Sequence, residues 1–123
     1  MEWTEAWKAA ENEASQKTGA FVVCGSGSSM EPLYTAGTIL VVAPTAFETL
    51  VAGSTVLYYN EDGTPVMHVL VAHTRNGWRV TGLNNDVHDY TPVTPKNLAG
   101  IVIHAFTPKG RPALGQVIRV ATR

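Results

Sequence analysis

Two adjacent serines, Ser28 and Ser29, lie in the polar stretch GSGSSMEPLY at residues 25–34 and are followed directly by Met-Glu-Pro. A serine hydroxyl is a poor nucleophile unless a neighbouring base accepts its proton. Without such a base, a stretch of this composition forms a polar loop between strands. The serines can therefore do chemistry only if another part of the chain supplies the base.

Lysine is the first candidate base, and the positions of the lysines in the sequence decide whether one can serve. None lies between the serines and residue 95, because the four lysines are Lys8, Lys17, Lys96 and Lys109. A serine–lysine dyad whose lysine stands on a strand in the middle of the chain is therefore excluded. Histidine remains, with four candidates: His68, His73, His88 and His104.

His68 and His73 both lie in PVMHVLVAHT, residues 65–74, a run that indicates a buried strand. Because side chains alternate along a strand, their spacing predicts that the two rings point to opposite faces. At most one of them then meets a given serine. His88 stands beside Asp89 in a polar loop and is the alternative base. His104, like His73, is expected to be a strand residue of the surface or the core.

The elements that must position these residues are one helix and a series of short strands. A helix is predicted over residues 2–17, where apolar residues recur at intervals of three and four. Beyond it, runs rich in Val, Ile, Thr and Tyr alternate with Gly, Pro, Asn and Asp, which is typical of strands and turns. Turns are indicated at 60–65 and 75–77. The predicted strands cover residues 20–24, 38–43, 54–60, 65–74, 78–82, 99–106 and 116–121.

The expected fold class is a mainly β, antiparallel domain with one N-terminal helix. With 123 residues, of which 45% are hydrophobic, the chain can bury one core and is too short for two ordinary domains. The single domain comprises an amphipathic helix over residues 1–19, a β core over 20–106, and a C-terminal loop and strand over 107–123.

The net charge and the cysteine content limit the kinds of ligand and partner that the chain is expected to bind. A formal net charge of −1 gives no basic surplus for neutralising phosphates, so we expect no nucleic acid partner. The single cysteine, Cys24, cannot form an internal disulfide, and no metal-ligand spacing surrounds it, so we expect neither a metal nor a cofactor.

The apolar runs of the sequence are far shorter than the roughly 18 residues of a membrane span. Acidic residues stand where a signal peptide carries positive charge. These features predict a soluble, cytoplasmic chain without an anchor.

Four segments of the sequence resemble a known family. SSMEPLYTAGTILVV (28–42) is similar to the first conserved boxes of the signal peptidase and SOS-repressor-peptidase superfamily, in which Met follows the nucleophilic Ser directly and, in signal peptidases, Pro stands two residues later. AGSTVLYYN (52–60), MHVLVAHTRNGWRVTGLNND (67–86) and LAGIVIHAF (98–106) are similar to the strands that follow. The resemblance covers roughly residues 20–106, and it implies a signal-peptidase/LexA-like β fold.

The resemblance also assigns roles to individual residues. Ser29 corresponds to the nucleophile and His68 to the general base, as in the branch of the family that uses His instead of Lys. Asp89, seven residues after Gly82, corresponds to the third member of a Ser-His-Asp site, with Asp86 in the same loop as the alternative. Backbone N–H groups around Ser28 and Ser29 are expected to bind the oxyanion. The implied activity is that of a serine endopeptidase that cuts extended peptides after small side chains.

Several positions depart from the family pattern. Its Gly-Asp pairs are replaced by Gly37-Thr38 and Gly53-Ser54, its Gly-Asp-Asn-Asn by a segment with Leu83, and its Arg after the catalytic His by Val69. These losses favour a second reading, a catalytically silent β module with a structural or assembly role, for example in a viral particle. A self-cleaving regulator is a weaker reading, because a helix-turn-helix domain has no room before residue 20. Exposed strand edges also make self-association an expectation.

Overall fold

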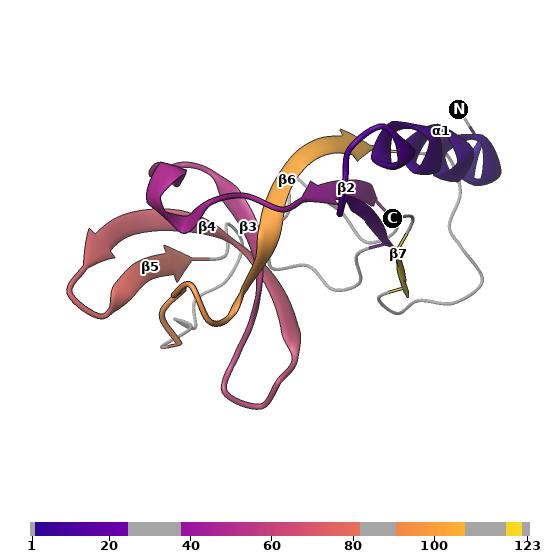
Figure 1. The fold of residues 1–123 in the computed structure, drawn as a ribbon. Coiled ribbons are helices and arrows are strands. Elements are labelled where there is room, and N and C mark those ends of the chain that lie inside the picture. The colour runs from indigo at the N-terminus through magenta and orange to yellow at the C-terminus, as the bar shows by residue number, and fades with distance from the viewer. Residues whose placement is uncertain (1, 25–37, 82–90, 108–117, 122–123) are drawn as a thin grey trace.

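The computed structural model describes residues 2–24, 38–81, 91–107 and 118–121. It is mainly β, with antiparallel strands and one N-terminal α-helix, which confirms the predicted fold class. Seven strands form one sheet in the order β5-β4-β3-β6-β2-β1-β7 (Figure 1). The elements are α1 (Trp3–Ser15), β1 (Phe21–Cys24), β2 (Ile39–Ala43), a 3-10 turn η1 (Phe47–Thr49), β3 (Thr55–Tyr59), β4 (Pro65–Thr74), β5 (Gly77–Thr81), β6 (Leu98–Phe106) and β7 (Ile118–Ala121).

Every predicted strand is present, and the ends of the helix and of each strand shift by at most two residues. The two predicted turns join β3 to β4 and β4 to β5, as expected for antiparallel hairpins. In the first turn, the Asn60 side-chain oxygen accepts the backbone N–H groups of Asp62 and Thr64, at 2.9 and 3.0 Å. Such side-chain acceptance is the reason that Asn favours turns.

α1 covers one face of β1 and β2. Its small residues Ala6, Ala10 and Ala14 are completely buried, and they pack against a cluster that includes Val22 and Val41. Alanine at this spacing lets the helix approach the sheet closely, while Trp3 and Trp7 stack with their ring centroids 5.3 Å apart. No helix among the described residues is long and apolar enough to cross a membrane.

β6 holds the two halves of the sheet together, and it curves through the middle of the molecule in Figure 1. Its Ile101 pairs with Ala43 of β2 on one side and with Val56 of β3 on the other. Pairing shifts register once on each side of β6, and such irregularities increase the twist and bend of strands. Gly100 stands where β2 comes closest, because a Cβ atom there would lie 2.6 Å from the Ala43 carbonyl oxygen.

Two further apolar clusters fill the sheet's faces. One lies around β3, β4 and β5 and joins Val56, Tyr58 and Leu70 to Trp78 and Val93; we call it the Tyr58 cluster. The other joins β1 to the middle of the sheet, through the residues Phe21, Val23, Val42 and Leu57, with Met67 packed against it. Leu57 stands between Val56 and Tyr58 on β3, and side chains alternate between the two faces of a strand. The two clusters therefore occupy opposite faces of the sheet.

Cys24 yields a pH-dependent prediction. Burial raises the pKa of its thiol above the ordinary 9.0, and the nearby Trp3 indole partly opposes this rise. The unfolded chain therefore loses the thiol proton at lower pH than the folded chain does. It follows that the free energy of unfolding decreases as the pH rises past 9.0. We expect Cys24→Ala to reduce this alkaline loss, measured by urea unfolding of both proteins below and above that pH. An identical pH dependence in the two proteins would contradict the assignment.

Gly100→Ala tests the close contact between β6 and β2. The added methyl group meets backbone rather than a flexible side chain, so β2 must shift, and overpacking of this kind costs about 1–3 kcal/mol. We expect the free energy of unfolding to fall by that amount. Thr107→Ala, at the exposed position just after the same strand, is the control and should leave stability unchanged. Equal stability of Gly100→Ala and the native protein would show that the contact is not a constraint.

Candidate active site

Of the three residues that the resemblance assigns to the site, His68 lies within the described residues, whereas Ser29 and Asp89 lie outside them. The neighbouring candidates also lie outside them, namely Ser28, Leu83, Asp86 and His88. The site is therefore built outward from His68.

His68 stands on β4 directly opposite Val56 of β3, in the interior of the sheet. Its side chain is only 5% exposed. Val56 belongs to the Tyr58 cluster, and paired residues of neighbouring strands point to the same face, so the imidazole lies on the side of that cluster. The Tyr58 hydroxyl lies 3.1 Å from Nδ1 of His68, within hydrogen-bond distance. The candidate base is thus buried, and one of its ring nitrogens is engaged.

The strand next to His68 leads into the segment that carries Asp89. Thr81, the last residue of β5, pairs with Val69, so β5 ends beside the candidate base. The described chain resumes at Thr91, and Val93 pairs with Trp78 through two backbone hydrogen bonds of 2.8 and 2.9 Å. The described residues on either side of this segment are therefore held by β5, Thr81 as its last residue and Val93 by the bridge to Trp78.

Asn97 fixes the chain that follows this segment. Its side-chain oxygen accepts the Thr94 N–H at 2.7 Å, and its side-chain nitrogen donates to the carbonyl oxygens of Tyr59 and Pro92, each at 3.0 Å. Because the Thr94 N–H can only donate, these contacts define which end of the amide is oxygen. Asn97 therefore ties residues 92–94 to the end of β3, one residue beyond Tyr58.

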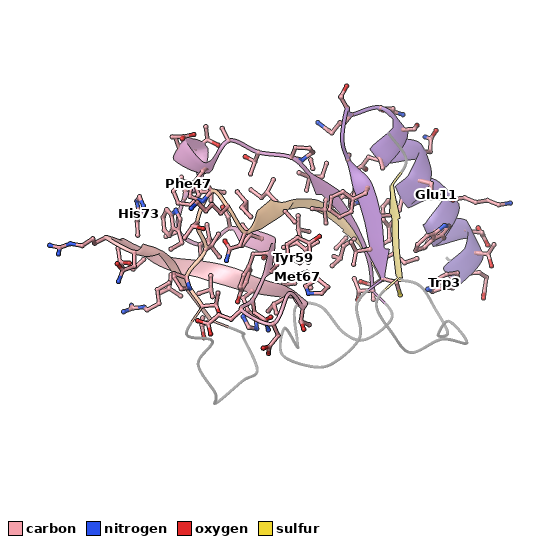
Figure 2. The ribbon with its side chains drawn as sticks, turned by 60° about the horizontal axis from the view of Figure 1, so that its bottom comes forward. Trp3, Glu11, Phe47, Tyr59, Met67 and His73 are labelled. Atoms are coloured by element: carbon pink, nitrogen blue, oxygen red, sulfur yellow. The ribbon has the colours of Figure 1, made fainter. Side chains whose placement is uncertain are left out.

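The prediction that His68 and His73 point to opposite faces is wrong. Residues Leu70 and Ala72 pair with consecutive residues of β5, which leaves Val71 as an extra residue in β4. A bulge of this kind reverses the alternation beyond it. His73 consequently stacks on Trp78, with centroids 4.9 Å apart and ring planes at 9°, on the side of the Tyr58 cluster. Phe47 meets the same imidazole edge-on, as Figure 2 shows at one end of the molecule.

His73 and His104 are surface residues of strands, in agreement with the sequence. His73 is exposed apart from its stacked face. His104 on β6 makes a 2.5 Å contact from Nδ1 to the Glu13 carboxylate of α1, and its ring stacks on Phe106. Its side chain is 46% exposed. Both rings have structural partners, and His68 is the buried histidine among those that the structure describes.

Sequence reasoning did not identify Tyr58 or Asn97. Tyr58 reads as an ordinary strand aromatic, and its relation to His68 depends on the register between β3 and β4. Once that register is known, Tyr58 and His68 lie on one face of adjacent strands at diagonal positions, a spacing within reach of long side chains. Asn97 has no sequence signal beyond its place in a turn.

The described residues contain no group of three or more His, Cys, Asp or Glu side chains placed to hold a metal ion. Comparison of the chain with family models, with curated proteins and with solved structures finds no match in any of the three.

Asn97→Asp tests the anchor next to the candidate site. The substitution keeps the oxygen acceptor but replaces the side-chain donor, which leaves the Tyr59 and Pro92 carbonyls without that partner. Two part-buried hydrogen bonds are lost, each worth about 0.5–1.5 kcal/mol, so we expect the free energy of unfolding to fall by about 1–3 kcal/mol. Asn60→Asp is the matched control, because Asn60 uses its oxygen in both turn contacts. Equal losses in chemical denaturation of the two variants would contradict the anchor role.

Proposed function

We propose that the protein is a signal-peptidase-like serine endopeptidase in which Ser29 is the nucleophile, His68 the general base and Asp89 the third member of the site. The observation that carries the proposal is the environment of His68. A histidine at the position given by the resemblance is buried in the interior of the sheet, with a hydroxyl on one ring nitrogen. Catalytic bases are commonly held in a fixed orientation by a hydrogen bond to one ring nitrogen.

The fold supports the proposal in a coarser way. An antiparallel β domain is the fold class that the resemblance implies, and a strand overlaps each of the four matched segments. Fold alone does not establish activity, because the same scaffold can serve unrelated functions. The functional argument therefore depends on the Ser29-Met30-Glu31-Pro32 sequence together with the buried His68.

The proposed reaction is hydrolysis of a peptide bond through an acyl-enzyme. Oγ of Ser29 attacks the carbonyl carbon while His68 accepts the hydroxyl proton, and backbone N–H groups stabilise the oxyanion. The C–N bond then breaks, and His68 returns the proton to the departing amine. A water molecule, deprotonated by the same imidazole, hydrolyses the ester and regenerates Ser29. The substrate class is an extended peptide with a small side chain before the cut bond.

The alternative is a catalytically silent β module with the same fold. Leu83, Thr38 and Ser54 stand where the family has carboxylates, and this loss is the specific observation that favours it. A silent module would keep the packing around His68 for structural reasons alone. The two candidates differ in one measurable property, which is cleavage dependent on Ser29.

Cleavage of an unbiased peptide mixture, read by mass spectrometry, tests the proposal. We expect the native protein to produce cuts that disappear with Ser29→Ala, because the proposed acyl-enzyme forms on Oγ of Ser29. We expect His68→Gln to slow the cuts by roughly 10²–10⁴-fold, the usual contribution of a general base. Ser28→Ala and His73→Gln are matched controls on adjacent or equivalent residues and should retain most activity.

Two results would count against the proposal. Cuts that persist in folded Ser29→Ala would assign the activity to another group. A folded native protein that makes no cuts would favour the silent module.

A further inference from the structure

The contact between Tyr58 and His68 is the best-defined polar contact of the candidate site. The phenolic oxygen lies 3.1 Å from Nδ1, both residues are buried, and the Tyr58 side chain is completely so. Their ring centroids are 6.2 Å apart and their planes are inclined by 52°, so the rings meet through the hydroxyl rather than by stacking. The geometry is that of a directed hydrogen bond.

The sheet holds both partners of this contact. Tyr58 pairs with Val66 of β4 on one side and with Leu98 of β6 on the other, while its ring packs among Val56, Leu70 and their neighbours. His68 follows Val66 by two residues and points to the same face. The position of the hydroxyl relative to the imidazole is therefore fixed by backbone pairing on three strands.

The direction of the hydrogen bond determines which ring nitrogen can act as a base. If the phenol donates to Nδ1, the neutral imidazole carries its proton on Nε2, and Nε2 cannot accept one. If Nδ1–H donates to the phenolic oxygen, Nε2 holds the lone pair. Only the second arrangement also suits the imidazolium ion, in which both nitrogens are donors. In that arrangement a proton arrives at Nε2 and leaves it without any rearrangement at Nδ1.

We infer that Tyr58 is a positioning residue: its phenolic oxygen accepts Nδ1–H of His68, fixes the ring and its tautomer, and presents Nε2 as the basic nitrogen. The inference therefore gives Tyr58 the contact at Nδ1 that the resemblance assigns to Asp89, and it replaces Asp89 in that part of the proposed site. The catalytic role of Tyr58 in this inference rests on the proposed function. The tautomer of His68 is a property of the folded chain and is measured without substrate.

Tyr58→Phe is the test, because it removes the hydroxyl and keeps the ring that fills the core. In ¹⁵N NMR of the native protein at a pH where the imidazole is neutral, we expect His68 to show a protonated Nδ1 and an unprotonated Nε2. In Tyr58→Phe we expect the two tautomers to mix. Tyr59→Phe is the matched control, since alternation along β3 places Tyr59 on the other face. It should leave the His68 spectrum unchanged, and thermal unfolding of each variant verifies the fold.

Kinetics provide the second readout. We expect Tyr58→Phe to lower kcat by roughly tenfold or more, a part of the general-base contribution, with KM nearly unchanged. The inference is overturned if native His68 carries its proton on Nε2, or if Tyr58→Phe leaves the tautomer as it is in the native protein. The predicted tautomer in a protein without peptidase activity would support Tyr58 as the residue that orients His68, and would reject the proposed function separately.

Discussion

The shared pairing of β6 with β2 and β3 is the constraint on which the rest of the structure depends. Ile101 pairs with strands on both sides, and the adjacent Gly100 lets the backbone of β2 approach to a distance that a larger residue would not allow. The helix-covered half and the half that contains His68 are consequently parts of one hydrogen-bonded sheet. Their relative register is set at this crossing rather than by a flexible connection.

The same crossing determines the position of the candidate base. A continuous row of paired residues leads from Ala43 through Ile101 and Val56 to His68. Tyr58 belongs to the next row on the same face, and its hydroxyl lies within hydrogen-bond distance of the imidazole. A side chain held in this way loses little conformational freedom when a reaction begins, which is an advantage for proton transfer. The order of His68 is therefore a property of the sheet and not of a loop.

Most of the architecture could be predicted from the sequence, because alternation of β-branched residues and turn residues acts locally. The strands were predictable for this reason, and so was the pairing of β3, β4 and β5 in hairpins, while the helix was predictable from its apolar residues at intervals of three and four. The bulge at Val71 was not, since an extra apolar residue in an apolar strand leaves no mark on the pattern. This bulge places the His73 side chain on the opposite face of the sheet from the one predicted. The Tyr58–His68 contact likewise depends on register, while Ser29 and Asp89 are predictions from resemblance alone.

The bridge between Trp78 and Val93 has a consequence for association between chains. β5 is an edge strand, and such strands expose unpaired N–H and C=O groups that can template the addition of another chain. Both backbone groups of Trp78 are already paired with Val93, and the Val93 carbonyl lies so close to Gly77 that a Cβ atom there would be 2.5 Å away. An incoming strand would first have to displace the protein's own backbone. At Trp78, the chain thus covers its own sheet edge where another strand would otherwise add.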